Sequence, residues 1–371
     1  LVGSEMCIRD RVVGINRLNP TTVEVLFSDN QRMTLDFYGE NVFRMFQDNG
    51  GGILRDPKAE PEAKILVNSP RKSVTELVLG DENGAVSVST SKIKVVLDKA
   101  TSLMKVVNLE TGAVVMEETA PVLFDKNEVT LKLKEAPDEY FYGGGVQNGR
   151  FSHKGRKIAI ENQNSWTDGG VASPNPFYWS TKGYGIMWYT FKKGVYDFGR
   201  EEAGVVTLSH ETDYLDLFVM VNDGAVALLN DFYQLTGNPV LLPKFGFYQG
   251  HLNAYNRDYW KEDENGILFE DGKRYKESQK DNGGIKESLN GEKNNYQFSA
   301  RAVIDRYKNH DMPLGWLLPN DGYGAGYGQT GTLDGNVQNL KDLTTYAHKN
   351  GVEIGLWTQS DLHPKAGVEP V

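Results

Sequence analysis

The chain of 371 residues contains one cysteine, Cys7, so no disulfide can form within it. No apolar run reaches the ~18 residues that a membrane-spanning helix needs, and the sequence therefore predicts no membrane partner. The six histidines are scattered, without an i, i+4 pair on a helix or an HExxH motif, so no metal site is predicted. A GxSxG nucleophile elbow is also missing, which argues against the serine hydrolases that depend on it.

Positive charge is also in short supply. Lysine and arginine number 40 against 50 aspartates and glutamates, which gives a formal net charge of -10. This balance argues against nucleic acid and anionic lipid as partners, because both require a basic face. It leaves a neutral partner such as a sugar open. Aromatic residues make up 11% of the chain, which suits stacking on sugars, but on composition alone long β-sheets explain them better.

The length predicts two domains, preceded by a short leader. Residues 1–11 (LVGSEMCIRDR) have no h-region or cleavage site, and they look like translated vector or adapter read-through. Residues 12–242 contain many short segments that alternate apolar and polar, such as 22–27, with turn residues between them. This spacing predicts an antiparallel β-sandwich. Residues 225–236 have helical spacing and stop at Gly237, which predicts a linker helix.

Residues 243–371 alternate strands with helices, the pattern of βαβ units around a parallel sheet. No glycine-rich phosphate turn follows the first strand, and the loops after the strands are long and polar, which favours a (β/α)₈ barrel. A barrel needs ~250 residues, whereas Pro243 to Val371 supplies 129, so the chain is predicted to end about halfway round. A charged insertion at 261–297 is predicted to be a solvated excursion, with a substrate-covering flap as the alternative. The strands are predicted at 244–249, 314–318 and 352–358, and the helices at 298–310 and 339–350.

Three motifs occur along the chain in a fixed order. The first is Phe141–Gln147 (FYGGGVQ), followed by a loop that contains Asp168 and by the segment PFYWS. The second is Leu242–Gln249 (LPKFGFYQ), and the third is 313–323 (PLGWLLPNDGY). In this order they resemble glycoside hydrolase family 31, over nearly the whole chain from about Val12. The resemblance implies a galactose-mutarotase-like sandwich followed by a (β/α)₈ barrel, and a retaining enzyme that acts on α-glucosidic linkages and needs no cofactor.

Finer features suggest a branch of that family. Segments 250–258, 316–324 and 355–364 look most like the 3-α-isomaltosyltransferase, or cycloalternan-forming, branch. Gln147 stands where the family usually has glutamate, and the third motif ends Asn-Asp-Gly-Tyr instead of Asn-Asp-x-Asp-Tyr. These departures concern substrate preference more than reaction class. The resemblance implies an α-glucan or oligosaccharide substrate and an extracellular or cell-surface location for the full-length bacterial-type enzyme.

Four residues are candidates for substrate binding. Asp168 matches the family's aspartate on a sandwich loop, and Asp321 matches the sugar-binding aspartate after the second strand. Each also stands before glycine, where aspartate commonly serves a turn. Trp357 and Asp361 follow the third strand; taken singly, Trp357 fits a barrel-core residue slightly better than a stacking platform, and Asp361 is more plainly explained as a polar residue that opens a loop.

The resemblance places the reacting groups elsewhere. Retaining glycosidases use two carboxyl groups about 5–5.5 Å apart, one as nucleophile and one as acid and base. In the family these are aspartates that end strands four and six, which would lie beyond Val371. We therefore name no catalytic residue and predict that the chain alone is inactive. Hydrolysis and transfer to a sugar both remain open.

Two other functions remain open on the sequence. The chain could be a non-catalytic carbohydrate-binding sandwich, in which case the barrel-like segment is incomplete by nature. It could also be a barrel enzyme for phosphosugars, which would need a glycine-rich phosphate loop after strands seven and eight. The acidic balance suits that anionic substrate poorly.

Overall fold

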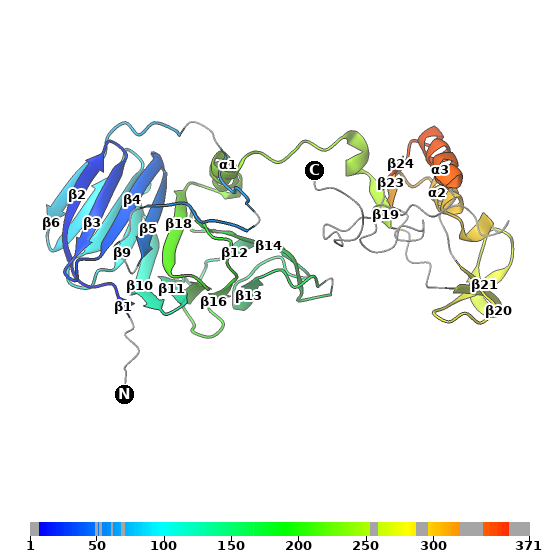
Figure 1. Ribbon diagram of the computed structural model, residues 1–371, viewed down its shortest axis with the longest axis horizontal. Coiled ribbons are helices and arrows are strands. Elements are labelled where there is room, and N and C mark those ends of the chain that lie inside the picture. The colour runs from blue at the N-terminus through cyan, green and yellow to red at the C-terminus, as the bar shows by residue number, and fades with distance from the viewer. Residues whose placement is uncertain are drawn as a thin grey trace. The chain divides into compact units, whose positions relative to one another are not determined.

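The computed structural model describes residues 7–48, 51, 54–60, 62–67, 71–165, 167–252, 259–286, 296–318 and 337–355. The chain divides into two compact units, residues 1–239 and 240–371 (Figure 1). Among the described residues, no helix has both the length and the apolar character to cross a bilayer.

The first unit consists mainly of two large antiparallel sheets. The larger sheet has the order β13-β16-β17-β11-β10-β9-β8-β7-β6, and β1 also pairs with β10. Its strands are β1 (Cys7–Ile8), β6 (Val78–Glu82), β7 (Ala85–Ser89), β8 (Ile93–Asp98), β9 (Met104–Asn108), β10 (Val114–Asp125), β11 (Glu128–Lys134), β13 (Arg156–Ile160), β16 (Gly194–Phe198) and β17 (Val205–His210). The second sheet has the order β12-β14-β15-β18-β5-β4-β3-β2. Its strands are β2 (Val12–Asn19), β3 (Thr22–Phe27), β4 (Arg32–Gly39), β5 (Val42–Asp48), β12 (Phe141–Gln147), β14 (Val171–Ser180), β15 (Tyr184–Trp188) and β18 (Tyr214–Val221).

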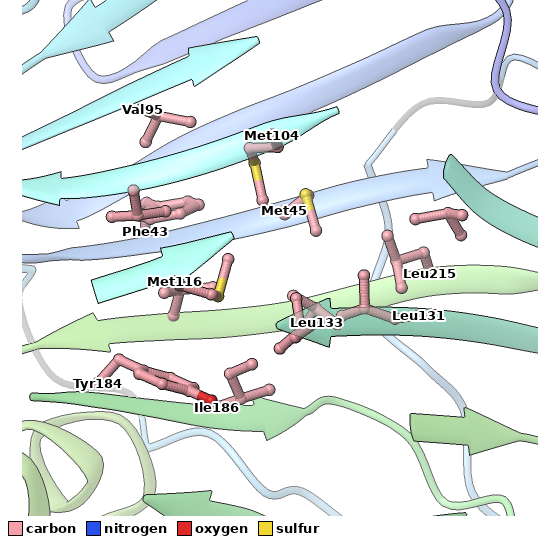
Figure 2. Close-up of a cluster of buried hydrophobic side chains, with 14 of the residues drawn as sticks. Phe43, Met45, Val95, Met104, Met116, Leu131, Leu133, Tyr184, Ile186 and Leu215 are labelled. Carbon is pink, nitrogen blue, oxygen red and sulfur yellow. The ribbon is translucent and has the colours of Figure 1, made fainter. Parts of the chain in front are cut away.

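The core lies between these two sheets. Strands β7, β8, β11 and β17 alternate buried and less buried side chains, because successive side chains of a strand point to opposite faces. Figure 2 shows the result: Val95, Met104 and Leu131 of the larger sheet meet Phe43 and Ile186 of the other. The predicted antiparallel sandwich is therefore confirmed.

The outer face of the second sheet is covered in part by helix α1 (Ala225–Thr236). Leu228 and Leu235 of α1 belong to a second apolar cluster with Phe177 and Phe218 of the sheet. Because this cover exists, β5 and β15 are buried along their whole length instead of alternating. The change of sequence period at 225–236 correctly predicted the helix, which Gly237 ends with a φ of 92°.

The segment interpreted above as a leader takes part in the sandwich from Cys7 onward. Strand β1 pairs with β10. The Arg9 side chain is buried and donates to both carboxylate oxygens of Glu118, at 3.0 and 2.8 Å, and to Gln47 Oε1 at 3.1 Å. Excluding residues 7–11 from the fold was therefore wrong, because Arg9 supplies the counter-charge for a fully buried carboxylate.

The second unit contains a parallel sheet of order β19-β23-β24. Apolar side chains of α2 and α3, among them Ile304 and Leu343, pack with Leu317 of β23. This strand–helix–strand–helix–strand order confirms the predicted βαβ units. Closure of the sheet into a barrel stays a prediction. The elements are η1 (Lys244–Phe247), β19 (Gln249–Leu252), η2 (Tyr296–Phe298), α2 (Ala300–Asn309), β23 (Leu314–Leu318), α3 (Val337–Lys349) and β24 (Glu353–Ile354).

The first parallel strand does not lie where the apolar run predicted it. Residues 244–247 form a 3₁₀ turn, and β19 begins at Gln249. Pro243 starts the turn, and the N–H groups of Gly246 and Tyr248 donate to carbonyls within it, so the backbone is satisfied locally. An apolar run of this length fits a strand or a turn equally well, which is why the prediction failed.

The insertion predicted as a solvated excursion contains a small sheet of its own. β20 (Tyr259–Leu268) pairs antiparallel with β21 (Arg274–Ser278) and β22 (Ile285–Lys286). Trp260 stacks on Phe298 at a centroid distance of 5.6 Å, and Tyr275 meets the Phe298 ring edge-on at 5.0 Å. The insertion is thus anchored to the start of α2 by an aromatic cluster.

Candidate functional site

Asp168 lies in an exposed turn that is hydrogen-bonded to the residue after β12. The Gly169 N–H donates to Asn148 O at 2.9 Å, and the Asn148 N–H donates to Gly170 O at 3.0 Å. The Asn148 side chain also donates to Ser165 O at 2.6 Å. The loop that carries Asp168 is therefore held at several points by the turn that follows the FYGGGVQ strand.

The carboxylate of Asp168 lies directly against a glycine. A Cβ atom on Gly149 would approach Asp168 Oδ1 to 2.0 Å, and Gly149 also has a φ of +66°. Arg150, the next residue, donates to Gly169 O at 3.0 Å and so fixes the same turn. An exposed carboxylate held in this way can accept hydrogen bonds from two neighbouring hydroxyls of a ligand, and bonds to a charged acceptor are the stronger kind.

The three glycines of the motif shape strand β12. Gly143, Gly144 and Gly145 all have positive φ, and the β12–β14 register shifts between Gly143 and Gly145. A Cβ on Gly145 would come within 2.1 Å of Ser173 O. The motif is thus a bulge that brings β12 close to the PFYWS strand, as bulges often re-aim side chains beside a site.

Gln147 has a structural role at the end of the same strand. It is buried, and its Nε2 donates to Gly144 O and to Ala159 O, each at 3.0 Å. Both partners are acceptors, so a carboxylate here would set negative oxygens against two carbonyls. The departure from the family's usual glutamate therefore fits the local hydrogen bonding.

An aromatic group follows this edge of the sheet. Tyr142 and Trp179 are cross-strand partners whose rings stack at 4.6 Å. Phe151 meets Tyr142 edge-on at 5.5 Å and is 86% exposed. Sequence analysis assigned these rings no role, because their pairing depends on a non-local register. The available signal was that Phe141 and Tyr178 point inward, which leaves their neighbours on the outer face.

The buried ionisable groups beneath this edge favour their neutral forms. Burial lowers the pKa of His153, whose Nε2 hydrogen bonds to Gly143 O at 2.8 Å. Burial raises the pKa of Glu139, although it accepts hydrogen bonds from Ser180 and from the Ala136 N–H.

The other three candidates, Asp321, Trp357 and Asp361, lie outside the described residues, so only Asp168 is placed. Within the described part of the chain, no three histidine, cysteine, aspartate or glutamate side chains gather as metal ligands.

Residues 32–197 match the family description "Glycosyl hydrolase 31 N-terminal galactose mutarotase-like domain". The chain is 27% identical over 149 residues to an α-xylosidase of Emericella nidulans, covering 40% of this chain and 19% of that protein. It is 21% identical over 345 residues to an α-xylosidase of Saccharolobus solfataricus, covering 88% of this chain and 40% of that protein. The chain thus spans less than half the length of the curated relatives it matches.

Two solved structures have a similar fold. A Flavobacterium johnsoniae GH31 dextranase, complexed with isomaltotriose, has a TM-score of 0.71 at 14% identity, over 94% of this chain and 38% of that one. The cycloalternan-forming enzyme of Listeria monocytogenes has a TM-score of 0.69 at 15% identity, over 94% of this chain and 32% of that one. By these comparisons, residues 32–197 are similar to the N-terminal domain of glycoside hydrolase family 31.

Proposed function

We propose that this chain is part of a retaining glycoside hydrolase or transglycosidase that acts on α-linked gluco-oligosaccharides. The observation that carries the proposal is the clamped loop that presents Asp168, an exposed carboxylate, at the sheet edge that also carries the half-buried rings of Tyr142 and Trp179 and the exposed ring of Phe151. Carboxylates and aromatic rings are the two kinds of group that recognise the hydroxyls and the C–H faces of a pyranose.

In this proposal Asp168 binds substrate and does not react with it. The reacting carboxyl groups would end strands four and six of a barrel, of which β19, β23 and β24 are the first three strands. We place neither group within this chain, and we propose Asp321, Trp357 and Asp361 as further binding residues at the strand ends. The chain alone is then expected to show no turnover.

The substrate has two candidate forms. The resemblance of the strand-end segments to the isomaltosyltransferase branch favours α-glucosyl oligosaccharides, and the fold shared with the cycloalternan-forming enzyme is consistent with it. The related sequences are α-xylosidases, which makes an α-xyloside the second candidate. A non-catalytic carbohydrate-binding sandwich remains the alternative function.

The test uses the full-length enzyme that contains this chain. It is assayed with isomaltotriose, maltotriose and p-nitrophenyl α-xyloside, and the anomer first released is identified by proton NMR. We expect an α-anomeric product, since two displacements retain configuration. A β-anomeric product would refute the retaining mechanism, and the absence of turnover on every substrate would favour the binding protein.

A variant tests the role of Asp168. We expect Asp168→Asn to raise KM about tenfold or more with a smaller change in kcat, because a hydrogen bond to a charged acceptor is replaced by a weaker one. Asp29→Asn, in the exposed turn between β3 and β4, is the matched control. Equal KM values for the two variants would remove Asp168 from the site.

A further inference from the structure

A cleft lies on the outer face of the second sheet, beside α1. Its volume is about 830 Å³, which falls within the size range of small-molecule sites. Its lining includes Tyr38 of β4 and Tyr189, residues of α1 on one side, and residues from 56–59 and 62–67 on the other. We call it the α1 cleft.

The walls of the α1 cleft are fixed at both ends. The buried Arg44 side chain donates to both carboxylate oxygens of Asp216, at 2.8 and 2.7 Å, and also to Asp56 Oδ1 at 2.9 Å. At the other end, the Val67 N–H donates to Leu235 O at 2.8 Å. A cleft held open in this way binds without the cost of ordering a loop.

One buried carboxylate of α1 lines the cleft. Asp231 is 3% exposed, and its Oδ2 accepts from Asn41 Nδ2 at 2.7 Å and from Asn222 Nδ2 at 3.0 Å. Its Oδ1 faces Lys72 Nζ at 3.6 Å. A hydroxyl both donates and accepts, so a single hydroxyl can donate to Asp231 Oδ1 while it accepts from Lys72.

The remaining lining suits a neutral, polyhydroxylated ring. Tyr38 and Tyr189 supply aromatic surface beside apolar side chains of β5 and α1. The guanidinium of Arg71, which also pairs with Asp36, lies 3.9 Å from the Tyr38 ring centroid. Four basic and three acidic side chains line the cleft, so the two signs nearly balance. A ligand with a strong charge would require an excess of one sign.

We propose that the α1 cleft is a second, non-catalytic binding site for a short neutral oligosaccharide. The site is separate from the Asp168 loop, and its occupancy does not depend on the reaction proposed above. It would hold a glycan chain on the sandwich while another part of the same chain is processed, which raises the effective local concentration of substrate.

The test measures binding to the 371-residue chain by isothermal titration with isomaltotriose, maltotriose and glucose 6-phosphate. Ala59→Trp places a bulky side chain in the α1 cleft and is expected to weaken binding of a neutral trisaccharide at least tenfold. Lys72→Met, which keeps the aliphatic stem, is expected to weaken it about threefold to tenfold. Asp29→Asn, a charge change in the exposed turn between β3 and β4, is expected to leave this binding unchanged.

Ala113→Trp, on the exposed hairpin between β9 and β10, is the matched control for Ala59→Trp and should bind as the parent chain does. The thermal unfolding midpoint of each variant is measured to check that the variant is folded. Unchanged affinity in Ala59→Trp would overturn the proposal, as would binding of glucose 6-phosphate alone or no trisaccharide binding. Because catalysis is not measured, the proposed reaction can fail while this site survives, and the reverse also holds.

Discussion

The two units of the chain bury their strands to different degrees. In the sandwich, β5 and β15 are buried along their whole length, and the sheets share one continuous core. In the second unit, the parallel sheet contacts two helices, yet Val240, Leu241 and Phe247 before it are 85%, 88% and 67% exposed. Parallel strands are ordinarily covered on both faces.

This difference indicates where each unit obtains its stability. Sandwich strands pair with sequence neighbours in long antiparallel ladders and then close on a second sheet, so the unit completes its own core. The described parallel strands are short and bury only one small cluster. We therefore expect the second unit to open at lower denaturant concentration than the sandwich.

The largest expected effect tests that difference directly. Phe43→Ala removes a ring that is 0% exposed between the sheets and should destabilise the sandwich by about 3–5 kcal/mol. Leu317→Ala, at an equally buried site of β23, should cost about 2–5 kcal/mol, but only in the second unit. Hydrogen exchange followed by mass spectrometry reports protection in each unit separately. If Leu317→Ala lowered protection in the sandwich as much as Phe43→Ala does, the two units would not be independent.

Low pH should destabilise the sandwich through a buried histidine of its core, which gives a second way to compare the two units. Burial lowers the pKa of His210 to about 4, and its Nδ1 hydrogen bonds to Lys192 O at 3.0 Å. The unfolded chain binds this proton below about pH 6.5, whereas the folded chain binds it only below about pH 4. The contribution of His210 to the free energy of unfolding is therefore complete above about pH 6.5. It is lost as the pH falls to about 4, and the loss amounts to about 3 kcal/mol.

The variant His210→Phe isolates that contribution. Its ring can keep the contacts with Trp188 and Tyr196, whose centroids lie 4.8 and 5.5 Å away, but it cannot titrate. Urea unfolding from pH 7.5 to 4 should show a shallower loss of stability in the variant than in the parent chain. Parallel pH curves would show that His210 does not contribute to acid sensitivity.

Sequence patterns identified the sandwich because the alternation of apolar and polar residues in its strands follows the burial of their side chains. Alternation marked β8 and β11, and the change to helical spacing marked α1. The same method missed β20, because this strand is mostly exposed and charged and so carries no alternating signal. It also misplaced the first parallel strand, where an apolar run after Pro243 forms a turn.

The candidate site was predictable in part. The family motif located Asp168, whereas the positive φ values of the three FYGGGVQ glycines came from the structure. Sequence could not show that Gly149 leaves room for the Asp168 carboxylate or that Trp179 pairs with Tyr142. Those relations depend on cross-strand register and loop packing, which join residues distant in the sequence.

The smallest expected effect concerns the sheet edge that carries the Asp168 loop. Gln147→Glu replaces an amide that donates to Gly144 O and Ala159 O with a carboxylate that repels both. We expect a loss of about 1–3 kcal/mol at pH 7. Burial would raise the pKa of the new carboxyl group, so the loss should shrink as the pH falls and the protonated acid regains one donor.

Gln163→Glu is the control for Gln147→Glu, since it adds the same charge at an exposed position of the neighbouring loop. Surface changes of this kind usually alter stability by less than about 0.5 kcal/mol. Hydrogen exchange at residues 167–170 should increase in Gln147→Glu and not in the control, because the turn that follows Gln147 holds that loop. If both variants unfolded at the parent's urea midpoint at pH 7, the edge would not depend on this amide. Its glutamine would then be explained by substrate preference instead of by folding.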